Sequence, residues 1–201
     1  MKGKIITASL AFVYTGCLAP DFIPHQYFGG LESAELNDFT LPNYVQYFEL
    51  RQGPIDSSYS FEHIPLLRFD PLGYEQLDIG QQIDIEFIDT TNGFLQGCAP
   101  NNCPIYIASV GESLSVVDSI PLLKSFLGAL DRPAEFALWI KQWGFTLLEF
   151  YAFEDGSYSL IVVQENAEGT QETYQLFVSQ DGEILSQIKI ETLTDKVEGL
   201  H

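Results

Sequence analysis

The stretch from residue 146 to residue 192 decides the fold. It reads TLLEFYAF at 146–153, SYSLIVVQ at 157–164, ETYQLFVS at 172–179 and EILSQIKIET at 183–192. All four segments are rich in aromatic and β-branched residues, which favour strands. Asp155-Gly156 and Asp181-Gly182 each join two of them, and Asp-Gly is a favoured two-residue hairpin turn. We therefore predict a four-stranded antiparallel meander, in which Ile184, Ile188 and Ile190 mark the buried face of the last strand.

Two helices are predicted before the meander. The first covers residues 119–128 and ends at a glycine. For the second, Asp131 is the expected N-cap, Pro133 lies in the first turn and Gly144 follows the end. One face of this second helix has the spacing of a core-packing stripe: Phe136, Ala137, Ile140 and Trp143. A helix pair leading into an antiparallel meander resembles a pattern in uncharacterised bacterial envelope proteins, a resemblance that implies no activity.

Strands and turns are also predicted between residues 39 and 118. The expected strands are Tyr44–Leu50 and Leu66–Phe69, followed by a hairpin over 104–118 that turns near Gly111. Asp70-Pro71-Leu72-Gly73 fits a type I turn. We expect an α+β fold that is mainly antiparallel sheet, with the meander packed against the two helices.

A further strand is predicted around residue 85. Ile83, Ile85 and Phe87 alternate with acidic residues, and a period of two is typical of a strand with one solvated face. Asp84 and Glu86 would share that face, close to Asp89. Such a cluster could hold a calcium ion. The solvated face of a strand is the simpler explanation, and no EF-hand spacing is present.

The composition excludes several function classes. Hydrophobic residues make up 46% of the chain and charged residues 18%, which is enough apolar material for a core and excludes a wholly disordered acidic chain. Nine Lys and Arg stand against 28 Asp and Glu, a net charge of 9 − 28 = −19. We therefore expect no direct binding to nucleic acid or to anionic lipid headgroups.

The chain begins with MKGKIITASLAFVYTGC at residues 1–17. A basic start, a short apolar run and a small residue before Cys17 describe a secretory signal. The segment resembles the lipobox of bacterial lipoproteins, with Tyr14 where a Leu is usual. The resemblance implies that Cys17 carries the lipid and becomes the first mature residue. An ordinary secreted protein, or a buried strand over 5–14, are the alternatives.

Two further cysteines, Cys98 and Cys103, flank the turn-forming residues Pro100, Asn101 and Asn102. In an oxidising compartment we expect them to form a disulfide, with free thiols or a metal site as the alternatives. A disulfide that closes a loop this short should stabilise the fold by about 2 kcal/mol.

Most catalytic signatures are absent from the sequence. It has no Gly-x-Ser-x-Gly elbow, phosphate loop, His-Glu-x-x-His or dinucleotide fingerprint, and only His63 is placed as a plausible base. We expect no catalytic residue, metal or cofactor, and we expect His63 to be an ordinary surface or hydrogen-bonded residue. The aromatic residues suggest instead a contact patch in the less regular half of the chain, formed by Tyr44, Tyr47, Tyr59 and Tyr74.

These observations predict a signal peptide at 1–16, a lipid-anchored tether at 17–38, one α+β domain at 39–193 and a flexible C-terminus at 194–201. The leading function hypothesis is a non-enzymatic, lipid-anchored protein of the bacterial cell envelope, facing the periplasm or the exterior. It would bind another protein, as an accessory subunit of a membrane-associated complex. One alternative is an acidic inhibitor or immunity protein against a basic toxin or hydrolase. The other is a polysaccharide-acting enzyme that uses carboxylates.

Overall fold

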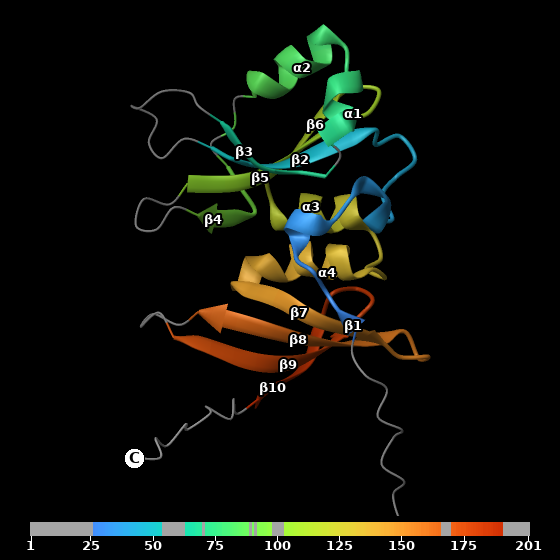
Figure 1. Cartoon of the computed structure of the whole chain (residues 1–201), viewed down its shortest axis with the longest axis vertical. Coiled ribbons are helices and arrows are strands. Elements are labelled where there is room, and N and C mark those ends of the chain that lie inside the picture. Colours follow the sequence, from blue (N-terminus) through green and yellow to red (C-terminus); the bar gives the residue numbers. More distant parts are fainter. Residues whose placement is uncertain are drawn as a thin grey trace, which may run out of the picture.

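The computed structural model describes residues 26–53, 63–69, 71–88, 90, 92–97, 103–165 and 170–190. They form four stacked layers along the longest axis of the molecule (Figure 1). The first layer holds helices α1 (Pro71–Gln76) and α2 (Ile79–Glu86). Sheet B forms the second layer and contains β3 (Ile64–Arg68), β2 (Tyr47–Gln52), β5 (Cys103–Val110), β4 (Leu95–Gly97) and β6 (Leu114–Val117).

The third layer holds helices α3 (Ile120–Leu127) and α4 (Pro133–Trp139), with the 3-10 turn η3 (Ile140–Trp143) continuing α4. Sheet A is the fourth layer. Its strands, in spatial order, are β1 (Gln26–Tyr27), β7 (Phe145–Ala152), β8 (Ser157–Glu165), β9 (Gln171–Ser179) and β10 (Ile184–Ile190). Both sheets are antiparallel, so the predicted α+β class with a helix-packed C-terminal meander is confirmed.

The meander β7–β10 packs one face on α4. Phe136 of α4 lies 4.6 Å from Tyr158 and 5.7 Å from Phe150, measured between ring centroids. Both Asp-Gly pairs lie in hairpin connections, but each connection has three residues and not the predicted two. It is closed by the pair Phe153 and Ser157 in one hairpin and by Ser179 and Glu183 in the other. Gly156 and Gly182 end these connections at positive φ angles of 80° and 78°. The turns therefore use the backbone conformation that glycine adopts without strain.

The predicted buried face of the last strand is wrong. Ile184 packs against the core, but Ile188 is exposed. The register of β10 shifts between Ile184 and Ser186, so the residues after the shift change face. Ile188 pairs with Gln175 on the face that points away from α4.

The two predicted helices are present, with one change at a cap. Arg132, not Asp131, occupies the N-cap of α4. The buried carboxylate of Glu135 accepts hydrogen bonds from the backbone N–H groups of Asp131, Arg132 and Thr40, at 2.8, 3.0 and 2.5 Å. Gly144 ends η3 in the left-handed conformation, as predicted. Phe136, Ala137 and Ile140 are core residues, whereas Trp143 is partly exposed.

Strand β2 lies at the centre of sheet B, between β3 and β5. Phe48 and Leu50 on one face join the main core, which extends through α3 and α4 to sheet A. Tyr47 on the other face packs against Leu77 and Ile85 of the α1–α2 layer. The predicted hairpin over 104–118 is confirmed as β5 and β6.

Two predictions for residues 70–88 are wrong. Pro71 begins helix α1 and does not lie in a type I turn; Asp70 is outside the described residues. Helix α2 replaces the strand predicted around Ile85. Asp78 and Gln81 form a capping box at its start, which stabilises the helix that period-two alternation obscured.

The described part of the predicted tether, residues 26–38, lies against the domain. Residues 26–38 pair with β7 through β1 and continue into two 3-10 turns, η1 (Leu31–Ser33) and η2 (Leu36–Asp38). Leu31 is buried in the main core. Residues 26–38 are therefore part of the fold.

Candidate interaction surface

A cluster of charged and aromatic side chains is buried between sheet B and the α1–α2 layer. Its centre is the fully buried pair Glu49 and Arg51, two residues apart on the same face of β2. The Glu49 carboxylate also accepts hydrogen bonds from the Tyr47 hydroxyl, at 2.5 Å, and from Arg68 Nε, at 3.1 Å. Three donors, two of them on cationic side chains, thus surround one buried carboxylate and offset part of the free-energy cost of burying it.

Arg51 connects this cluster to the residues before β3. One guanidinium nitrogen donates to Glu49 and another to the backbone carbonyl of His63. Arg51 Nε has no hydrogen-bond partner within the described ranges. The Arg51 guanidinium thus links β2 to the backbone at His63, and it is not exposed to solvent.

His63 lies next to this cluster and is hydrogen-bonded, as expected. Its Nδ1 is 2.7 Å from the hydroxyl of Tyr106, and both side chains are buried. Burial raises the pKa of Tyr106 to about 12. Burial also raises the pKa of Tyr47, with the neighbouring Glu49 carboxylate adding to the effect.

The cluster joins sheet B to the two helices through Tyr74 of α1. The guanidinium carbon of Arg68 lies 4.3 Å from the ring centroid of Tyr74. The ring centroids of Tyr47 and Tyr74 are 5.7 Å apart. The Tyr74 hydroxyl donates to Glu86 of α2 at 3.1 Å. Leu77 and Ile85 complete the contact on the apolar side. The helix layer is therefore held in one orientation by polar and apolar contacts together.

That orientation leaves apolar residues of α2 facing solvent. Ile79, Ile83 and Phe87 are 75%, 49% and 80% exposed, whereas Ile85 is fully buried. At about 100° per residue, the first three fall within roughly 80° of arc on one face of the helix. Ile85 points the opposite way, into the sheet. We call Ile79 and Ile83 of α2, together with its C-cap Phe87, the α2 stripe. Leu72 of α1 is another exposed apolar residue of this layer.

Carboxylates border the α2 stripe. In the same helical projection, Glu86 lies on one flank and Asp84 on the other. Glu75 and Asp78 add two more exposed acids, and residues 71–88 contain no Lys or Arg. The α1–α2 layer thus presents a narrow apolar stripe within a negative rim.

The predicted tyrosine patch does not form as a unit. Tyr44 is exposed, Tyr74 is half-buried, and Tyr59 lies outside the described residues. Tyr47 is fully buried and hydrogen-bonded to Glu49, because α1 covers its face of sheet B. The exposed apolar residues of α2 were missed because a strand was predicted there.

Asp84 and Glu86 belong to a helix, so the predicted shared strand face does not exist; Asp89 is outside the described residues. No group of three metal-ligating side chains occurs in the parts of the chain that the structure describes. Cys103 is buried at the start of β5, while Cys17 and Cys98 lie outside the described residues. Lipidation and the disulfide stay predictions.

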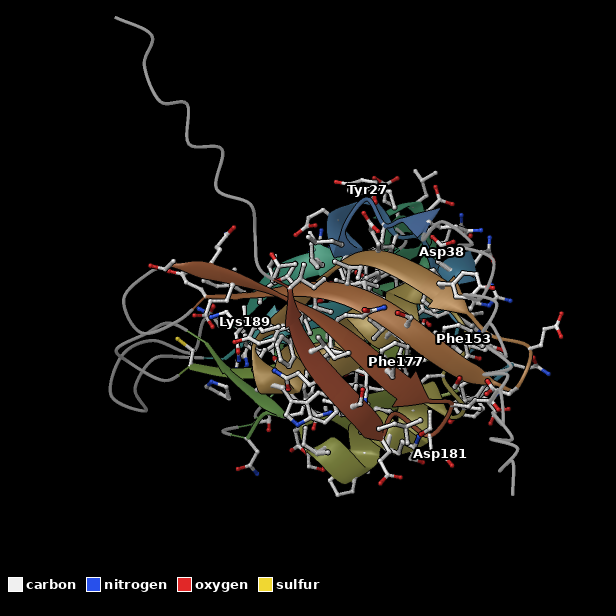
Figure 2. The ribbon with its side chains drawn as sticks, turned by 90° about the horizontal axis from the view of Figure 1, so that it is seen from below. Tyr27, Asp38, Phe153, Phe177, Asp181 and Lys189 are labelled. Atoms are coloured by element: carbon white, nitrogen blue, oxygen red, sulfur yellow. The ribbon has the colours of Figure 1, made fainter. Side chains whose placement is uncertain are left out.

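A second exposed surface lies at the other end of the molecule. Figure 2 looks onto the outer face of sheet A, where none of the described helices covers the strands and Phe153 and Phe177 lie side by side. Their ring centroids are 6.3 Å apart. Both acidic and basic residues border this sheet, including Asp181 and Lys189 (Figure 2), so its charge selects no class of partner.

Three surface depressions in the described part of the chain each have one carboxylate in their lining, from Glu32, Asp38 or Asp118. Glycoside hydrolysis by the usual mechanism needs two, so none of these three fits it. Among the described helices, none has the length and apolar character needed to cross a membrane. Comparisons of the chain with protein-family models, curated proteins and solved structures found no match.

Proposed function

We propose that this chain is a non-enzymatic, lipid-anchored protein of the bacterial cell envelope that binds another protein through the α2 stripe. The observation that carries the proposal is the exposure of Ile79, Ile83 and Phe87 on one helix face. A helix lying on a sheet normally turns its apolar face inward. Here α2 has an inward apolar residue, Ile85, and a separate outward stripe.

Covering the stripe would be energetically favourable. Complete burial of one Ile or Phe side chain is worth about 1.5–3 kcal/mol relative to exposure. Three such residues supply a hydrophobic centre of the kind that dominates protein–protein contacts, and the flanking acids supply a polar rim.

The proposed anchor places this surface away from the membrane. Residues 18–25 are the eight residues between Cys17 and Gln26, and they span at most about 28 Å when extended. Gln26 lies in β1, within sheet A, at the opposite end of the long axis from α2 (Figure 1). An anchor at Cys17 would hold sheet A near the lipid and leave the α2 stripe accessible to a partner.

A second candidate is supported by charge. After loss of residues 1–16, which contain two lysines and no acid, the chain would carry 7 − 28 = −21. Together with the acidic rim of the α2 stripe, this charge favours an inhibitor or immunity protein against a basic toxin or hydrolase. Such a protein would suppress its partner's activity with an affinity that falls as salt rises.

Native mass spectrometry of the protein purified from its own host in mild detergent tests the proposal. We expect a chain lacking residues 1–16, with acyl mass on Cys17, in a complex of defined stoichiometry. The double variant Ile83→Ser/Phe87→Ser should lose the complex. The matched variant Leu185→Ser/Ile188→Ser, on sheet A, should keep it. An unprocessed monomer in repeated preparations would refute the proposal.

A further inference from the structure

We infer that the partner surface recognised by the α2 stripe is a basic amphipathic helix, an inference that rests on the proposed function. It comes from the shape of the stripe and from the charges at its edges. Both features belong to residues 79–87 and are independent of the anchor.

The shape of the stripe fits a single helix. Ile79 and Phe87 are eight residues apart, which at 1.5 Å per residue is about 12 Å along the axis. The stripe is one side chain wide, with Ile83 midway along it. A narrow apolar seam with a charged residue on each flank is the geometry by which two helices pack side by side.

The flanks determine the charge of the partner. Asp84 and Glu86 occupy the positions that pair with charged residues of an opposing helix in such a seam. Neither carboxylate has a Lys or Arg partner among the salt bridges of the described residues. Lys or Arg at the facing positions would complement them, whereas Glu or Asp would be repelled.

The same charges argue against two other occupants. A second copy of this chain would place like charges opposite each other, because residues 71–88 hold four acids and no base. An anionic lipid surface would be repelled in the same way.

The probe for the test is a synthetic helix of about 18 residues, long enough to be partly helical alone. It carries Leu on one face and Lys at both flanks, and a matched peptide carries Glu in place of Lys. Affinity is measured by fluorescence anisotropy with the purified full chain. We expect the Lys peptide to bind and the Glu peptide to bind at least about tenfold more weakly.

Variants locate the binding site. Ile83→Ser/Phe87→Ser should weaken binding of the Lys peptide about tenfold or more. Asp84→Asn/Glu86→Gln should weaken it several-fold and reduce its salt dependence. Two matched controls should leave the affinity unchanged: Glu154→Gln/Glu183→Gln removes the same charge elsewhere, and Leu185→Ser/Ile188→Ser removes exposed apolar side chains from sheet A.

Three outcomes would overturn the inference. In the first, the control variants weaken binding as much as the α2 variants, which would mean that the peptide senses only net charge. In the second, the Glu peptide binds as well as the Lys peptide. In the third, the wild-type chain binds anionic vesicles of phosphatidylcholine and phosphatidylglycerol through Ile83 and Phe87.

A partner that crosslinks to the α2 stripe in the host, combined with a failed charge test, would refute only the basic helix. Failure to find any partner in the host would refute the proposed function, whatever the peptides do.

Discussion

Arg68 lies over the ring of Tyr74, with 4.3 Å between the guanidinium carbon and the ring centroid. The same guanidinium donates to the buried Glu49 carboxylate at 3.1 Å. One side chain of β3 therefore joins the centre of the buried cluster to helix α1. In α2, Ile85 packs with Tyr47 and Leu77 on the side that faces the sheet, and the α2 stripe lies on the side that faces solvent.

The first prediction concerns Ile83 and Ile85, two residues apart in α2. Ile85→Ala should lower the free energy of unfolding by about 2–5 kcal/mol, because Ile85 is fully buried. Ile83→Ala should change it by less than about 1 kcal/mol, because Ile83 is half exposed and alanine favours a helix. Urea denaturation measures both. Equal losses would indicate that the two residues share one face, as in a strand.

The second prediction concerns Glu49. Glu49→Gln leaves the buried Arg51 without its carboxylate, and removing one partner of a buried ion pair costs about 3–5 kcal/mol. Glu183→Gln, at an exposed position, should stay within about 0.5 kcal/mol of the wild type. If Glu49→Gln proved as mild as this control, the cluster would not be what holds the helix layer to sheet B.

The third prediction compares two turn glycines. Gly156 and Gly182 both have positive φ, so alanine costs backbone strain of about 1–3 kcal/mol at either site. A Cβ at Gly156 meets open space, whereas a Cβ at Gly182 would overlap the indole of Trp139. Trp139 Nε1 also donates to the Gly182 carbonyl at 2.9 Å. Gly182→Ala should therefore lower the melting temperature more than Gly156→Ala, and equal shifts would contradict this packing.

The fourth prediction concerns pH. Burial raises the pKa of Glu135 above its ordinary value of 4.5, despite three backbone donors that lower it. A raised folded-state pKa adds stability that is complete below the unfolded pKa and is lost as pH rises through the folded pKa. The wild type should therefore lose stability relative to Glu135→Gln as pH rises through that window.

Denaturant unfolding of wild type and Glu135→Gln between about pH 4 and pH 8 measures this difference. Subtracting the two curves removes the contribution of the other acidic residues. If the wild type instead gains stability relative to Glu135→Gln as pH rises, the three N–H donors outweigh burial and stabilise the ionised carboxylate.

Local pattern was sufficient to predict the meander. The Asp-Gly turns and the strand composition of residues 146–192 act within hairpins, so neighbouring residues contain most of the information. The same holds for Gly144, which ends η3 where a left-handed residue is required.

Two features were missed, one because a local signal was ambiguous and one because it depends on contacts distant in sequence. The alternation around Ile85 is short enough to fit a strand, and the Asp78–Gln81 capping box was the available signal for a helix. Tyr47 reads as an exposed aromatic residue because nothing near it in sequence shows that α1 covers that face of sheet B. The candidate surface could be recognised only once α2 was placed.

We propose that the α2 stripe contacts a protein partner in the envelope. Site-specific photocrosslinking in the native host tests it most directly, with the crosslinker at position 79, 83 or 87 and at the control position 185. We predict one adduct of defined mass from the three α2 positions and none from position 185. No adduct from α2, or the same adducts from position 185, would contradict the account.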